Sequence, residues 1–243
     1  MAVATRGGRL VSDQYLEVRI FAQDRVVADT ARAGLLRHQF LDELEASEQL
    51  DRYPVLINLN ELTVLTPDAA DELIVRWLER VRSPRRPVIA GIATYSRGMA
   101  GAIATALRDA KQCAYHVRSA PIGEVPRAVG DVTGTLLDTL DAVRIQDQGQ
   151  ATAREVADHL HLNHTTAANR LSDLVGRGLL QRHAQPGKVG DLFAYPWPAV
   201  AGPSFVPSDL HEQQAAIAHG NGGVRLSSNG VPVQGRKPVA LQH

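Results

Sequence analysis

The sequence is short of several features that would place it in a class at once. Its single cysteine, Cys113, excludes a disulfide framework within the chain and is compatible with a reducing cytosol. No apolar run approaches the length of a membrane span, and the first residues lack the apolar core of a secretory signal. Lys and Arg number 26, and so do Asp and Glu, so no overall basic excess indicates a nucleic-acid partner. We therefore expect a soluble, cytoplasmic protein.

Residue patterns that carry catalysis are also missing. His159, His161 and His164 lie close together, but no cysteine or paired carboxylate completes a metal-binding set. His211 is followed by glutamate as in a zinc-protease motif, yet Ala215 stands where that motif needs its second histidine. We therefore predict that the protein is not an enzyme and that it has no catalytic residue, no metal site and no cofactor.

The first half of the sequence alternates between strand-like and helix-like patterns. Residues 54–60 are a compact apolar run of the kind that parallel sheets bury, and residues 97–111 carry apolar side chains at helical spacing. The expected strands are 14–21, 26–27, 54–60, 87–93 and 114–117, and the expected helices are 28–52, 66–81 and 97–111. This alternation predicts an α/β layer domain over residues 14–120, preceded by a flexible leader, 1–13.

The string VLINLNELTVLTPD, from Val55 to Asp68, joins an apolar strand through a short loop to a helix start. It resembles the STAS domain of anti-sigma-factor antagonists, and the resemblance covers about residues 14–117. In that family the loop carries a phosphorylatable serine, which makes Thr66 the candidate regulatory phosphosite here, although Thr66-Pro67 replaces the usual serine pair. Threonine, proline and aspartate also form a favourable start to a helix, and we prefer this capping role for Thr66.

Residues 151–178 contain two short apolar stripes at helical spacing. The first consists of Val156, Ala157 and Leu160, and the second consists of Ala167, Leu171 and Leu174. Asn163 is a favourable N-cap for the second helix, and Gly178 ends it. Because so few residues separate the stripes, the two helices must cross steeply, which predicts a helix-turn-helix.

The next residues extend this motif into a wing. Two short strand-like runs, 179–183 and 192–195, flank a glycine-rich turn at 186–190. A helix-like segment, 133–147, precedes the motif. The order resembles the MarR and ArsR families of bacterial regulators, including Gly-Leu-Leu-x-Arg at 178–182, over about residues 132–197. It implies a winged helix-turn-helix DNA-binding domain, 132–198, joined to the first domain by a linker, 121–131.

A second helix in the major groove would present the side chains opposite its apolar stripe to DNA. Asn169 and Arg170 are suited to bidentate contacts with bases, and Lys188 at the turn is the candidate wing contact to the DNA backbone. The predicted DNA-binding residues are Asn163, His164, Thr165, Thr166, Asn169, Arg170, Arg177 and Lys188. Against this hypothesis, residues 130–198 hold six basic and eight acidic side chains, whereas a DNA-binding surface should be positive.

The last residues change in composition. From 199 to 243 glycine and proline are frequent and Phe205 is the only aromatic residue, so we expect a flexible, disordered tail with one short helix, 208–218. The whole chain is thus predicted to be a sequence-specific transcriptional regulator that binds double-stranded DNA as a homodimer. In this hypothesis the STAS-like domain mediates dimerisation, partner binding or signal sensing, and the tail is a second candidate surface for a protein partner. The alternative is an adaptor whose winged helix binds protein and not DNA.

Overall fold

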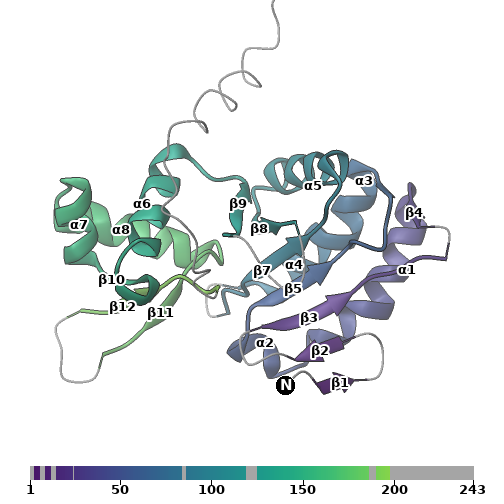
Figure 1. Ribbon diagram of the computed structural model, residues 1–243, viewed down its shortest axis with the longest axis horizontal. Helices are drawn as coiled ribbons and strands as arrows, with labels where there is room; N and C mark the ends of the chain where they lie inside the picture. The colour runs from purple at the N-terminus through teal and green to yellow at the C-terminus, as the bar shows by residue number, and fades with distance from the viewer. Residues whose placement is uncertain are drawn as a thin grey trace, which may run out of the picture. The chain divides into compact units, whose positions relative to one another are not determined.

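The computed structural model describes residues 3–5, 9–11, 15–23, 25–83, 86–118, 125–185 and 190–197. The expected tail helix, 208–218, therefore lies outside the described residues, as does the turn that carries Lys188. Within the described residues the protein is a mixed α/β structure (Figure 1), which confirms the predicted fold class at that level.

A seven-stranded sheet runs in the order β1-β2-β3-β5-β7-β8-β9. Its parallel centre consists of β3 (Leu16–Arg19), β5 (Val55–Asn58), β7 (Ala90–Ala93) and β8 (Cys113–Val117). Three antiparallel strands complete it, β1 (Val3–Thr5), β2 (Arg9–Val11) and β9 (Arg127–Gly130).

All three of these antiparallel strands differ from the sequence predictions. In place of a loose leader, β1 and β2 extend the sheet beyond β3. In place of a linker, β9 pairs with β8, so the expected edge strand at 114–117 is an inner strand. The short polar segments around these strands carry little periodicity, which is why the sequence did not reveal them.

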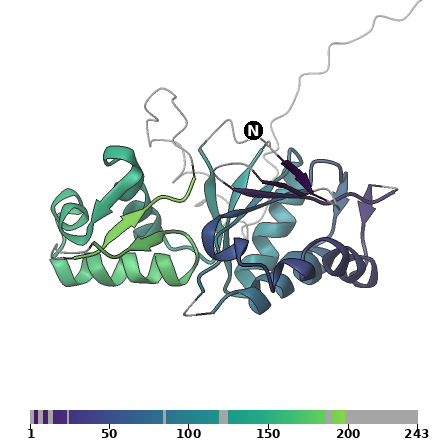
Figure 2. The same cartoon turned by 90° about the horizontal axis from the view of Figure 1, so that it is seen from below.

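The helices of this part all cover one face of the sheet (Figure 2). The parallel strands follow one another in chain order, so each right-handed crossover returns on the same side. The expected helix 28–52 is broken into α1 (Thr30–Phe40), η1 (Asp42–Leu44) and α2 (Gln49–Arg52). The expected helix 66–81 consists of α3 (Pro67–Ala70), a short π-helix η2 (Asp71–Val75) and α4 (Arg76–Val81). The expected helix 97–111 is α5 (Arg97–Asp109), and the strands β4 (Val26–Val27) and β6 (Val64–Leu65) pair in a separate parallel ribbon. We call residues 15–130 the sheet module.

Residues 131–197, the C-terminal module, form three helices and a small antiparallel sheet. Its helices are α6 (Gly134–Arg144), α7 (Ala153–Leu160) and α8 (His164–Gly176), with a short turn η3 (Asp147–Gly149). Its strands are β10 (Gln150–Thr152), β11 (Gln181–His183) and β12 (Leu192–Ala194), in the order β10-β12-β11. The expected helices and hairpin strands are present, whereas no strand was expected from the sequence at the position of β10.

The two modules share a core. Alternate residues of the parallel strands point to opposite faces, so Val55 and Ile57 pack against the helices while Leu56 packs in the cluster with the C-terminal module. Tyr115 is fully buried in that second cluster, with its ring 5.7 Å from Trp197 and 5.6 Å from Tyr195. The C-terminal module therefore buries the sheet face that no helix of the sheet module covers.

Gly91 makes room for this contact, because a Cβ atom there would lie 2.7 Å from the Trp197 ring. We expect Gly91→Ala to lower the free energy of unfolding by about 1–3 kcal/mol, the usual cost of overpacking a core. Urea denaturation of the full chain measures this. Gly101→Ala is the matched control, since a Cβ on this helical glycine meets nothing within 4 Å and should slightly stabilise α5. Equal effects of the two substitutions would contradict the packing of Trp197 on β7.

Candidate nucleic-acid interface

The helix α8 is bounded by the residues that the sequence indicated. The Asn163 Oδ1 accepts a hydrogen bond of 2.7 Å from the Thr166 backbone N–H, which caps the first turn. Gly178 follows the last turn with φ of +69°, and a side chain there would lie 2.4 Å from the Val88 carbonyl oxygen. Ala167, Leu171 and Leu174 are buried, so the apolar stripe faces the core as predicted.

The preceding helix α7 begins with a capping box. The Thr152 Oγ1 accepts from the Glu155 N–H, and the Glu155 carboxylate accepts from the Thr152 N–H at 2.7 Å. These hydrogen bonds hold the pKa of Glu155 below its usual value. Leu162 and the cap residue His161 both bond back to the Ala157 carbonyl, which closes the tight turn between α7 and α8.

The outer face of α8 is free to contact a partner. His164, Thr165 and Asn169 are exposed, while Thr166 and Arg170 are half-buried on its flanks. Arg170 thus lies at the side of the helix, not opposite the buried stripe as expected. Within the part of the chain that the structure describes, the side chains of His164, Thr165, Asn169 and Arg170 have no hydrogen bond or ion pair. The structure therefore brings five of the predicted residues together on one surface, with Thr166 beside them. The five are Asn163, His164, Thr165, Asn169 and Arg170.

Arg177 does not belong to that surface. Its Nε donates to Asp173 at 2.8 Å, and its Nη1 donates to the carboxylate of Asp131 at 3.0 Å and to the Asp131 carbonyl. Although burial opposes it, these hydrogen bonds raise the pKa of Arg177. The Cys113 thiol donates to the same Asp131 carbonyl at 3.0 Å, and burial raises its pKa. Arg177 thus ties the end of α8 to Asp131, directly after β9, and the structure does not bring it together with the other predicted DNA-binding residues.

A second arginine buttresses the same junction. Arg82 donates from Nε to the Val88 carbonyl at 2.8 Å and from Nη1 to the Cys113 carbonyl at 2.7 Å, and burial lowers its pKa to about 10. Its Nη2 lies beneath Gly178, 2.9 Å from where a Cβ would be. Tyr115 donates its hydroxyl to the Leu179 carbonyl one residue further along. The residues that end α8 are thereby fixed on β7 and β8.

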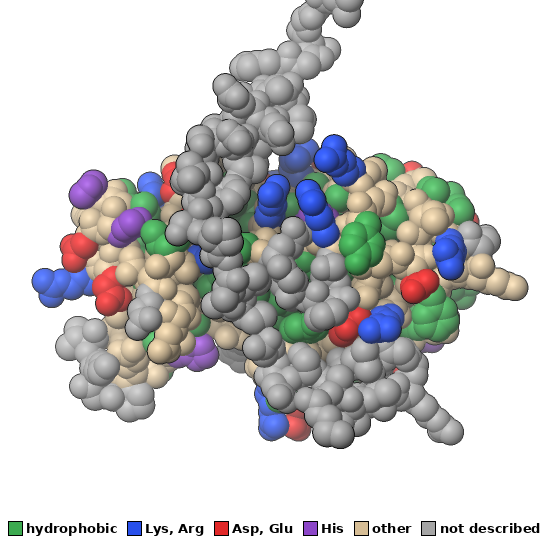
Figure 3. All heavy atoms as spheres, viewed as in Figure 1, with side chains coloured by type: hydrophobic (Ala, Val, Ile, Leu, Met, Phe, Trp, Pro, Cys, Tyr) green, Lys and Arg blue, Asp and Glu red, His purple; other side chains and the backbone are tan. Residues whose placement is uncertain are grey.

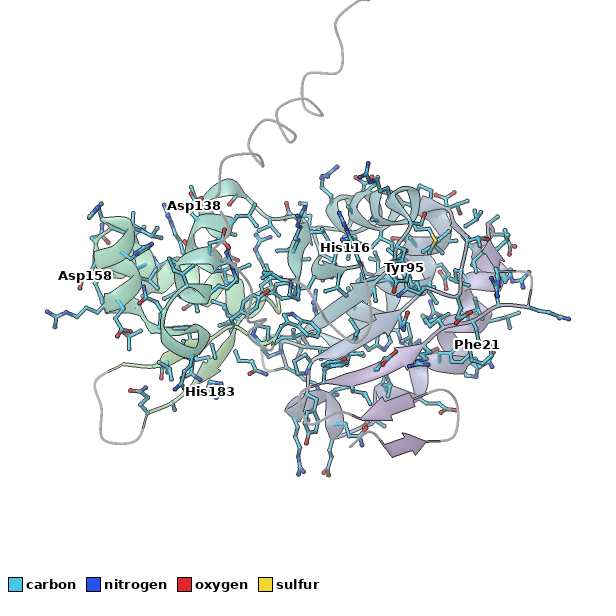
Figure 4. All side chains as sticks on the ribbon, viewed as in Figure 1. Phe21, Tyr95, His116, Asp138, Asp158 and His183 are labelled. Atoms are coloured by element: carbon cyan, nitrogen blue, oxygen red, sulfur yellow. The ribbon has the colours of Figure 1, made fainter. Side chains whose placement is uncertain are left out.

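The wing is described only in part. Lys188 lies outside the described residues, and Arg182 on β11 is paired with Asp191 at 2.6 Å from its Nε. His183 on the same strand is exposed, as labelled in Figure 4. The described part of the wing therefore offers an exposed imidazole, and its arginine is already neutralised.

Internal ion pairs hold four of the eight acids of the C-terminal module together with three of its six bases. Asp131 and Asp173 share Arg177, Asp141 pairs with Arg144, and Asp191 pairs with Arg182. Asp138 and Asp158 are exposed, on α6 and α7 respectively (Figure 4). Half of the eight acids are thus held in ion pairs inside the module, and the outer face of α8 is left with uncharged polar side chains and Arg170.

Two features of the sheet module were not predicted from the sequence, a buried carboxylate on β3 and two exposed aromatic side chains. Glu17 is buried on the strand β3, where its carboxylate accepts from the Asn58 amide at 2.8 Å and from Arg19 Nε at 2.9 Å. Phe21 and Tyr95, at the carboxyl ends of β3 and β7, are 51% and 67% exposed (Figure 4). Phe21 is the last residue of the expected strand 14–21, and nothing in the sequence pattern distinguished it from its buried neighbours.

Thr66 is engaged as a helix cap. Its Oγ1 accepts from the Ala69 N–H at 3.3 Å and donates to the Ala28 carbonyl at 3.0 Å. Pro67 occupies the first helical position, where its missing N–H leaves no bond unmade. The geometry supports the capping role, and the phosphosite remains a hypothesis.

We expect Thr66→Ala to lower the free energy of unfolding by about 1 kcal/mol, and Thr66→Ser to leave it nearly unchanged, because only the hydroxyl caps α3. Chemical denaturation of the two variants measures both values. If Thr66→Glu changed partner or DNA binding while the fold stayed intact, regulation by phosphorylation would be the better account of this residue.

The anchor at the end of α8 gives a second stability prediction. Arg177→Ala should lower the free energy of unfolding by about 2 kcal/mol, because it leaves partly buried acceptors on Asp131 and Asp173 without their charged donor. Arg108→Ala, an exposed arginine on α5, is the control and should stay within about 0.5 kcal/mol of the parent. A double-mutant cycle with Asp131→Ala should show coupling; strict additivity would rule out the ion pair as a stabilising contact.

Two searches of the described residues add no further site. No cluster of three His, Cys, Asp or Glu side chains able to hold a metal ion is found there, and no helix there is long and apolar enough to cross a membrane. Comparisons of the chain with protein-family models, with curated proteins and with solved structures give no match.

Proposed function

We propose that residues 131–197 are a winged helix-turn-helix that binds double-stranded DNA, and that the protein is a transcriptional regulator. The observation that carries this proposal is the outer face of α8, which exposes polar side chains without partners among the described residues on a rigidly anchored helix. The packing of α7 against α8 across a short turn and the antiparallel pairing of β11 with β12 support it, because this is the order of elements that presents a helix to the major groove.

The side chains on α8 divide into two roles. Asn169 and Thr165, near the middle of the exposed face, suit contacts with adenine and with a thymine methyl group. Asn163 and His164 lie at the positive end of the helix, where backbone amides meet a phosphate. Arg170, on the flank, reaches either a guanine or the backbone beside it.

The sheet module supplies the second half of the proposal. We propose that it is a STAS-like domain that mediates dimerisation, partner binding or signal sensing, with Phe21 and Tyr95 as its exposed aromatic contacts. An apolar side chain more than half exposed at a loop edge is the kind of group that a protein partner covers. One observation favours the adaptor alternative instead, namely the excess of acids over bases in the C-terminal module.

Salt dependence separates the two functions. Selection of a random duplex library with the purified full chain should recover a preferred site, and its affinity should fall steeply with salt because phosphate contacts release counterions. Binding that shows no salt dependence, or no recovery of DNA at all, would favour the adaptor.

On the selected site, Asn169→Ala and Arg170→Ala should each lower affinity by about 1–3 kcal/mol and relax preference at one base pair, as the loss of a base contact does. Lys188→Ala should instead weaken selected and scrambled duplexes alike and reduce the salt slope by about one unit. Arg108→Ala, which removes a charge from the sheet module, is the matched control. If Asn169→Ala, Arg170→Ala and Lys188→Ala all bound DNA like the parent, DNA would contact a different surface of the protein.

A further inference from the structure

Three histidines surround the turn between α7 and α8. His159 lies in the last turn of α7, His161 is its C-cap, and His164 is the first residue of α8. All three side chains are exposed, and Figure 3 shows histidines gathered at the end of the molecule formed by α7. This end carries the start of α8, the part of that helix proposed above to meet a phosphate.

His161 adopts a backbone conformation that favours glycine. Its φ of 53° and ψ of 42° lie in the left-handed region, which most side chains avoid. Glycine would adopt this turn without strain, and the described residues provide no hydrogen bond to the imidazole that would compensate. This conformation turns the chain between α7 and α8 and leaves the imidazole exposed, close in sequence to the start of α8.

Protonation of the three imidazoles would change the sign of the net charge around them. On α7 they share the surface with Arg154, Glu155 and Asp158, so that this segment is net negative while the histidines are neutral and net positive when all three are protonated. The charged side chains on the two helices that pack against α7 are Asp138, Asp141 and Arg144 of α6 and Arg170, Asp173 and Arg177 at the end of α8. Of these, Asp141 is paired with Arg144 and Asp173 with Arg177, so Asp138 and Arg170 remain.

We propose that His159, His161 and His164 form a phosphate-binding surface, which contacts the DNA backbone when the imidazoles are protonated. The inference rests on the proposed function and extends it, because it makes DNA binding depend on pH. The last turn of α7 favours a positive charge through the helix dipole, which suits His159 and His161. Imidazolium donates from both ring nitrogens, so each ring can bond a phosphate oxygen.

The test measures binding of the full chain to a labelled random-sequence duplex by fluorescence anisotropy, as a function of salt, at about pH 5.5 and about pH 8, on either side of the ordinary histidine pKa. We expect affinity to rise at least about tenfold at the lower pH and the salt slope to steepen by about two to three units, close to one for each new phosphate contact. The triple variant H159Q/H161Q/H164Q should bind equally at both pH values.

Two further variants make the outcome specific. His183→Gln removes an exposed histidine from β11 and should keep the pH response of the parent. His161→Gly relaxes the backbone, so it should unfold at higher denaturant while losing about one unit of the salt slope at low pH. An unchanged pH response in the triple variant overturns the histidine surface alone, whereas no binding by the parent at either pH overturns the proposed function.

Discussion

The structure depends on a parallel sheet that is buried on both faces. The four adjacent strands β3, β5, β7 and β8 consist mostly of buried apolar residues, and the same-handed crossovers place every helix of the sheet module on one side. The other face would expose Leu56, Tyr115 and their neighbours. The C-terminal module covers it, and the Trp197 ring lies over Gly91 where a larger side chain would keep it out. Removal of the C-terminal module would expose this face of the sheet, and removal of the sheet module would expose the apolar side chains that pack on it, so the two form one compact unit.

This shared core has a consequence for α8. The helix ends against the sheet, where Arg177 bonds to Asp131 and the Leu179 carbonyl accepts from Tyr115, while Gly178 leaves room for the Arg82 guanidinium. Its start, at Asn163, is at the exposed end of the C-terminal module. An event at the sheet that shifted β8 would therefore move the one end of α8 that is fixed and reorient the face that is free. Coupling of this kind needs contiguous packing, which the junction supplies.

The sequence was informative where local chemistry decides the structure. Thr66 and Asn163 cap helices because short polar side chains satisfy free N–H groups, and those positions could be named in advance. Ala167, Leu171 and Leu174 followed from helical spacing in the same way. Arg177 could not be assigned, because its partner Asp131 is 46 positions away in the sequence and only the fold brings them together. The sequence did not predict the pairing of β9 with β8 for the same reason. An edge strand of four residues has no periodicity of its own, so it depends on the strand with which it pairs.

The acidic composition of the C-terminal module, which argued against DNA binding, is a weaker argument once the positions of the charges are known. A net charge summed over a segment treats every side chain as equally available, yet an acid held by an arginine within the module contributes little beyond a few ångströms in salt. Asp131, Asp141, Asp173 and Asp191 are of this kind. What a polyanion would meet at the exposed end is set instead by Asp158, Glu155 and Arg154 together with the histidines beside them. Under the proposal above, protonation of those histidines would reverse the sign of this surface, a change that a net charge counted with neutral histidines does not include.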